Sequence, residues 1–183
     1  LLPTSTGPNL DNLAPLVGVE RLEAGKATAV IRFTLSAPRT SATGIPEGTQ
    51  VRTADKRYFK TEKYAEILPG ELTVDVVAVA DEAGSNSDGI AEGEINVLVD
   101  PIPYVSGAKS VSASTGGTDT EGDDSFTRRI NYAPSIFSVA GPVDAYEYFA
   151  SSWRSDVADT KIVCKEGYTI HIYFLMAGGR VPT

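Results

Sequence analysis

Few side chains in this sequence have the chemistry of a nucleophile or a general base. His171 is the only histidine, and it lies between Ile170 and Ile172 in a segment with the pattern of a strand. A Ser-His-Asp arrangement would have to use His171, but no nucleophile motif occurs near it. Cys164 is the only cysteine, and its place at the end of another predicted strand favours a small packed side chain over a nucleophile. We therefore predict no catalytic residues and expect that the protein is not an enzyme.

Two acidic segments have side chains that could bind a hard cation. Residues 81–88 (DEAGSNSD) resemble a calcium loop in composition, but their glycine and ligand positions do not follow the EF-hand order. The second segment contains Asp119, Glu121, Asp123 and Asp124. A solvated turn is the favoured interpretation of both segments, so we predict no metal site and no cofactor.

Two further patterns could bind a ligand. Tyr58, Phe59 and Tyr64 could form an aromatic platform for a sugar, although packing within a β-hairpin explains them as well. Residues 116–118 (GGT) do not form a phosphate-binding loop, because no Gly-Lys-Ser/Thr motif follows them. Neither pattern predicts a cofactor-binding residue.

Composition and charge exclude two classes of partner. The net charge of −8 and the isoelectric point near 4.7 disfavour binding to nucleic-acid phosphates. The sequence has no apolar run of about 18 residues, so we predict no membrane span. A single cysteine cannot form an internal disulfide. Because Met176 is the only methionine, Leu1 is not a translation start, and we expect the chain to be part of a longer protein.

The elements before residue 113 have the pattern of a β-rich domain. Apolar and polar side chains alternate over residues 26–36, and residues 71–80 are apolar on both faces, which indicates a central strand. Shorter strands are predicted over residues 50–53, 57–60, 64–68 and 94–99, with residues 37–44 as a loop. We predict an extended or short-helix segment over 1–25, then a mostly antiparallel β domain over 26–112.

Residues 114–130 (STGGTDTEGDDSFTRRI) form the joint between the two halves of the chain. Gly116 and Gly117 permit a tight turn, and a helix is predicted over 125–130. Asp123 or Asp124 is a suitable N-terminal cap for that helix, and the two arginines follow toward its C-terminal end.

The elements after the joint predict a small α+β domain over 113–183. Val143, Tyr146, Phe149, Ala150 and Trp153 share one face of a helix that ends near residue 154. Residues 157–164 and 168–175 read as an antiparallel hairpin with a turn at 165–167. We expect the helix to pack on this hairpin and to bury Trp153. The fold class is therefore α+β, a mostly antiparallel β domain followed by a small α+β domain.

Several segments occur in the order seen in one protein family. They are residues 16–22 (LVGVERL), 45–51 (IPEGTQV), 59–61 (FKT), 84–86 (GSN), 93–95 (GEI), 116–121 (GGTDTE), 128–130 (RRI), 140–142 (AGP), 145–146 (AY) and 157–159 (VAD). Together they resemble the baseplate J-like proteins of contractile phage tails, especially those of the P2-like group. Pro15 and Gly122 depart from the family pattern. The resemblance covers the chain after about residue 16 and implies the middle of a longer subunit, incomplete at its C-terminus.

The resemblance implies a structural role in a contractile phage or prophage tail. Members of the family are baseplate wedge proteins, which assemble around the hub and link to other wedge components. The implied partners are baseplate wedge and hub proteins and, in the full-length protein, further copies of itself. The implied location is the virion tail baseplate, after synthesis in the bacterial host cytoplasm. We expect the present chain alone to be a monomer or a weak, concentration-dependent oligomer.

Two other functions remain open on the sequence. A glycan- or receptor-binding β module of a tail or cell surface is the alternative to the baseplate subunit. A hydrolase is disfavoured by the single histidine and by the absence of a nucleophile motif.

Overall fold

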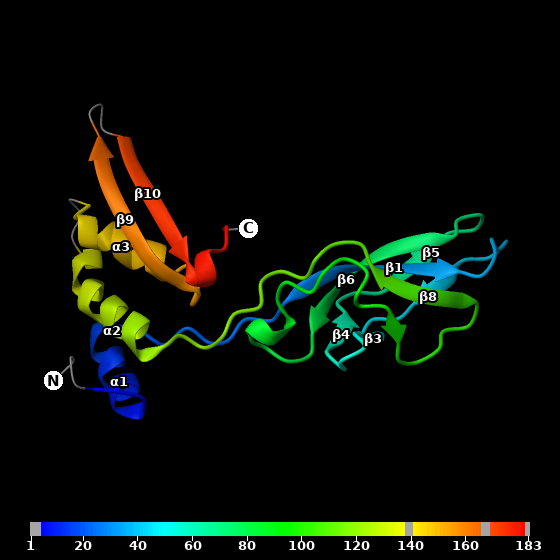
Figure 1. Ribbon diagram of the computed structural model, residues 1–183, viewed down its shortest axis with the longest axis horizontal. Helices are drawn as coiled ribbons and strands as arrows, with labels where there is room; N and C mark the ends of the chain where they lie inside the picture. The colour runs from blue at the N-terminus through cyan, green and yellow to red at the C-terminus, as the bar shows by residue number, and fades with distance from the viewer. Residues whose placement is uncertain (1–4, 138–140, 166–168, 182–183) are drawn as a thin grey trace. The chain divides into compact units, whose positions relative to one another are not determined.

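The computed structural model describes residues 5–137, 141–165 and 169–181. The chain forms two compact units (Figure 1), which are described separately: unit 1 is Leu1–Ala24 with Asp119–Thr183, and unit 2 is Gly25–Thr118. Unit 2 is therefore inserted into unit 1. The sequence-based division into 1–25, 26–112 and 113–183 differs in two respects: the N-terminal segment shares a unit with the C-terminal part, and unit 2 continues to Thr118.

Unit 2 is built from antiparallel strands. Its six-stranded sheet has the order β7-β3-β4-β6-β1-β8, and a second sheet pairs β2 with β5. The strands are β1 (Thr28–Leu35), β2 (Thr43–Ile45), β3 (Gln50–Arg52), β4 (Tyr58–Thr61), β5 (Ala65–Ile67), β6 (Thr73–Ala80), β7 (Val97–Leu98) and β8 (Val105–Ser110). A short 3-10 turn, η3, spans Ser85–Ser87. The predicted α+β class is confirmed, while β2 forms in a stretch that was predicted to be mostly loop.

The core of unit 2 follows from the alternation along its two long strands. In β1, Ile31 and Phe33 are buried while Arg32 between them is exposed. β6 lies between β4 and β1, as its predicted central position requires. The buried side chains of the core are Ala27, Ala29, Ile31, Phe33, Leu35, Ile45, Val51, Phe59, Ile67, Val76, Ala78, Ala80, Ile90, Ile95 and Ala108. Burial of this apolar set is the main stabilising contribution to unit 2.

The described residues of unit 1 form three α-helices and one hairpin. They are α1 (Pro8–Leu13), continued by the 3-10 turn η2 (Ala14–Val17), α2 (Asp123–Tyr132), continued by η4 (Ala133–Phe137), α3 (Val143–Ser151), β9 (Val157–Lys165) and β10 (Thr169–Met176), followed by η5 (Ala177–Gly179). β9 and β10 pair antiparallel, as predicted. Residues 166 and 167 of the predicted hairpin turn lie outside the described residues. No helix in the described ranges is long and apolar enough to cross a membrane.

The core of unit 1 lies between segments far apart in the sequence. Leu10, Ala14 and Val19 pack with Phe126, Ile130 and Ala133. This contact brings the N-terminal segment into the same unit as α2. Because the core is made by α1 and α2, only the small side chains Ala145, Ala150 and Ser151 of α3 are buried.

Two predictions about the helices of unit 1 are wrong. Trp153 is 50% exposed rather than buried, and its ring meets Phe174 of β10 only edge to face. Gly122, not Asp123 or Asp124, is the N-cap of α2, and it provides no side-chain hydrogen bond. Asp123 is instead the first helical residue, where its negative charge is favourable to the helix dipole.

Candidate assembly surface

A buried ion pair positions α2 within unit 1. Arg129 Nε donates to Glu121 Oε1 at 2.8 Å and Arg129 Nη2 donates to Oε2 at 2.7 Å. The same Nη2 also donates to the Glu20 carbonyl at 2.6 Å. The Leu22 amide donates to Glu121 Oε2 at 3.1 Å, so residues 20–22 are tied to both charged side chains. Sequence reasoning noted these charges only as a helix-dipole pattern and missed their pairing.

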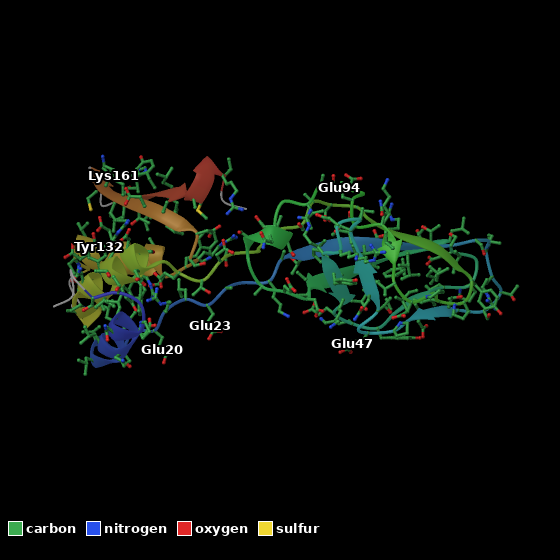
Figure 2. The ribbon with its side chains drawn as sticks, turned by 60° about the horizontal axis from the view of Figure 1, so that its bottom comes forward. Glu20, Glu23, Glu47, Glu94, Tyr132 and Lys161 are labelled. Atoms are coloured by element: carbon green, nitrogen blue, oxygen red, sulfur yellow. The ribbon has the colours of Figure 1, made fainter. Side chains whose placement is uncertain are left out.

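A second set of contacts joins the helices and the N-terminal segment. The Asp123 carboxylate accepts a hydrogen bond from the Gly7 amide at 2.9 Å and pairs with Arg21 at 2.8 Å. The Gly7 hydrogen bond, and then the Arg21 guanidinium, lower the pKa of Asp123. On α2, Tyr132 (labelled in Figure 2) hydrogen-bonds Glu147 of α3, and this bond raises the pKa of the Tyr132 hydroxyl.

The base of the β9–β10 hairpin is fixed by polar contacts. Arg154 makes two hydrogen bonds of 2.9 Å to the Asp156 carboxylate, and Arg180 reaches the same carboxylate at 3.2 Å. The Ala177 amide donates to the Asp156 carbonyl at 2.8 Å. Val157 and Met176, which pair across the hairpin at this end, are buried. The hairpin is thus held firmly at its base.

Beyond that base, large apolar side chains of α3, of the turn after it and of β10 are exposed. We call this set the unit 1 apolar surface, and its residues are Phe149, Trp153, Ile170, Ile172 and Phe174. The Trp153 and Phe174 rings meet edge to face with centroids 5.8 Å apart. Ile170, Ile172 and Phe174 alternate along β10 and therefore share the face that Trp153 contacts. Exposed aromatic and aliphatic side chains gathered in this way are typical of protein interaction sites.

The opposite face of the hairpin is mixed in character. Tyr173 and Leu175 are exposed there, and the His171 ring stacks on Tyr173 with centroids 6.2 Å apart. Tyr173 lies opposite Lys161 of β9, which is labelled in Figure 2. β9 carries charged side chains and β10 carries none, so the two edges of this small sheet differ in chemistry.

The two candidate nucleophilic or basic residues do not come together. Cys164 is exposed on β9, so the prediction that it packs is wrong, and it lies opposite Ile170. His171 lies opposite Val163. Successive residues of a strand point to opposite faces, so Cys164 and His171 are directed away from each other. They cannot act as a nucleophile and its base within one hairpin.

Four of the acidic candidates, Asp81, Asp88, Glu121 and Asp123, already have partners. The Asp81 carboxylate pairs with Lys60 at 2.7 Å, and Asp88 accepts from the Gly117 amide at 3.0 Å. In the joint, Glu121 and Asp123 are bound as described above. Among the described residues, no group of three or more His, Cys, Asp or Glu side chains could hold a metal ion.

The three aromatic candidates do not form one platform. Phe59 is buried in the unit 2 core, while Tyr58, its neighbour on β4, points the other way. The Tyr64 hydroxyl donates to Glu66 at 2.6 Å, which raises the pKa of Tyr64. Tyr58 lines an open polar depression of about 460 Å³, together with residues 55–57, 81–83 and 86–87.

Comparison with known proteins agrees with the architecture of unit 2. Residues 30–117 match the family model described as the baseplate J-like protein barrel domain. The fold also resembles a chain in the cryo-EM structure of the anti-feeding prophage (AFP) baseplate, 6-fold symmetrised, with a TM-score of 0.53 and 12% identity. That match covers 82% of this chain and 47% of the other, so the present chain spans about half its length. None of the curated proteins matches this sequence.

Proposed function

We propose that this protein is a structural wedge subunit of a contractile phage or prophage tail baseplate, because residues 30–117 match the family model of the baseplate J-like protein barrel domain. The family match carries the proposal, since it spans nearly all of unit 2. The proposed partners are other wedge and hub proteins, in a tail baseplate assembled after synthesis in the host cytoplasm. No catalytic step is part of this function.

The unit 1 apolar surface is the proposed contact for those partners. Aromatic residues are enriched at the centres of protein interfaces, where their burial supplies much of the binding free energy. Trp153 and Phe149 are 50% and 63% exposed, so a partner can still bury about half of each side chain. The fixed base of the hairpin pre-organises the surface, which lowers the entropic cost of binding.

Co-purification with the products of neighbouring tail genes tests this proposal. The variant Phe149→Ser/Trp153→Ser should lose the wedge partner while keeping its far-ultraviolet circular dichroism spectrum. The control Tyr64→Ser/Leu68→Ser changes exposed side chains of unit 2 and should retain the partner. Wild-type protein that binds none of these gene products would contradict the proposal.

A glycan-binding module is the second candidate, and the polar depression beside Tyr58 is the observation that favours it. A tyrosine next to carboxylate, amide and hydroxyl groups can stack on a sugar ring and accept its hydroxyl hydrogen bonds. Glycan-array binding by the isolated protein, abolished by Tyr58→Ala, would support this function over the wedge role.

A further inference from the structure

Strand β10 of unit 1 has one edge without a strand partner in the described part of the chain. The hairpin sheet has only two strands, so β10 bonds to β9 along one edge alone. In an antiparallel sheet, alternate backbone N–H and C=O groups of such a strand point outward and can pair with another strand. We propose that β10 pairs antiparallel with β10 of a second copy of this chain, giving a four-stranded sheet across a two-fold axis.

The composition of β10 is the first argument for a second copy. Residues 169–176 (TIHIYFLM) contain no acidic side chain, lysine, arginine, proline or glycine. Proteins usually protect exposed edge strands with such residues, and β9 does carry Asp159 and Lys161. An uncharged strand can lie against its own copy without repulsion between like charges. The open edge of β10, rather than that of β9, is therefore the pairing edge.

Symmetry supplies the second argument, because the apolar pattern of β10 is self-complementary. A two-fold axis perpendicular to the sheet keeps each face on the same side in both copies. With the axis at Ile172, Ile170 lies opposite Phe174 of the second copy, and His171 lies opposite Tyr173. On one face of the four-stranded sheet, the unit 1 apolar surfaces of both copies become continuous. On the other face, the His171 ring lies beside the Tyr173 ring of the second copy, which is a favourable cross-strand pair.

This inference goes beyond the proposed function, since it holds or fails whichever baseplate proteins the subunit binds. The pairing competes with the net charge of −8 on each copy, so the dimer should form at high protein concentration and be strengthened by salt.

Cysteine cross-linking tests the register. In a Cys164→Ser background, Ile172→Cys should give a disulfide-linked dimer on mild oxidation. Residues directly opposite on antiparallel strands have Cα atoms about 4.5–5.5 Å apart, within the range of a disulfide. Tyr173→Cys is the matched control, since Tyr173 is 51% exposed against 42% for Ile172. The two cysteines of the Tyr173→Cys dimer would be diagonal neighbours about 7–8 Å apart and should cross-link much more slowly. Equal rates for the two variants would overturn the register.

Sedimentation equilibrium tests the edge. Wild-type protein should dimerise with concentration, and Ile172→Lys should raise the dimer dissociation constant more than about tenfold, because like charges would face each other. Cys164→Lys puts the same charge on β9 and should change the dimer dissociation constant less than about twofold. A wild-type monomer at the highest attainable concentration would overturn the self-pairing, as would equal weakening by both variants. A wild-type monomer that still binds its wedge partner would overturn the self-pairing alone and leave the proposed function intact.

Discussion

Arg129 and Glu121 form a bidentate ion pair in which the two side chains are 3% and 0% exposed. Such a pair depends on both partners, because either charge left alone would be buried without compensation. It also connects α2 to residues 20–22, so its loss should loosen the N-terminal segment as well as the helix.

Glu121→Ala should lower the free energy of unfolding of unit 1 by about 3–5 kcal/mol, since it strands the Arg129 charge. Urea unfolding followed by tryptophan fluorescence measures this, because Trp153 is the only tryptophan and lies in unit 1. Asp159→Ala is the control, as it breaks the exposed pair with Arg128 and should cost less than about 1 kcal/mol. Equal effects of the two variants would show that burial of the first pair is unimportant.

Trp153→Ala should destabilise unit 1 by less than the approximately 3–5 kcal/mol that a buried tryptophan contributes. The reason is that half of the side chain is already exposed to solvent. Phe126→Ala, at a fully buried ring in the same unit, should show the full loss. Thermal and urea unfolding, followed by circular dichroism, compares the two variants, because Trp153→Ala has no tryptophan fluorescence. A Trp153→Ala loss as large as that of Phe126→Ala would contradict the exposed position.

Asp123→Asn should destabilise unit 1 at neutral pH and have little effect in acid. The folded-state pKa of Asp123 is lowered by the Gly7 amide and then by Arg21, so its carboxylate contributes stability above the unfolded pKa of about 3.9. That contribution is lost as the pH falls through the folded pKa. The difference in melting temperature between wild type and variant should therefore narrow below about pH 4. A difference that stays constant down to pH 2 would exclude this linkage.

Gly117→Ala should destabilise unit 2 by about 1–3 kcal/mol through overpacking. A Cβ atom at this position would lie 2.7 Å from the Gly84 carbonyl oxygen and 3.2 Å from Ala27 Cβ. Gly107→Ala in β8 is the control, because nothing lies within 4 Å of its added Cβ. Hydrogen–deuterium exchange of peptides from residues 25–118 should show faster exchange in the first variant only. Unchanged exchange in both would mean that the backbone adjusts without cost.

Replacing residues 25–118 by a short glycine-rich turn should leave unit 1 folded. Leu22 and Glu121 are already hydrogen-bonded, with the Glu121 amide 3.0 Å from the Leu22 carbonyl, so few residues are needed to join the two segments. The core of unit 1 contains no residue of the excised segment. Cooperative unfolding of the shortened protein by Trp153 fluorescence is the expected result, and a molten, non-cooperative transition would contradict it.

The two long strands of unit 2 could be predicted from sequence because each carries its own period. β1 and β6 alternate or remain apolar for eight residues each, which is enough to define both the strand and its place in the sheet. β2 has only three residues and forms by pairing with β5, so no local pattern marked it. β3, β4 and β5 are also short but were predicted, because turn residues flank them, whereas β2 follows a loop and is defined by its pairing with β5.

Unit 1 could be predicted less well because its contacts are non-local. The pattern of α3 correctly identified an apolar face, but amphipathicity does not say whether another element covers that face, and Trp153 is half exposed. Leu10 and Phe126 meet in one core although more than a hundred positions separate them, and nothing in either segment alone indicates this contact. Glu121 and Arg129 are eight residues apart, and Glu121 precedes α2, so helical periodicity does not predict that they pair.

The insertion of unit 2 determines how a stretching force would travel through the polypeptide. The strands that enter and leave unit 2 are clamped twice, by the Leu22–Glu121 hydrogen bond and by the Gly25–Thr118 pair at 2.8 and 3.2 Å. Tension applied at residues 5 and 181 is borne first by unit 1, and it passes across these clamps rather than along β1 or β8. Unit 2 is loaded only after the clamps shear, so an optical-tweezers trace should extend unit 1 before unit 2 yields.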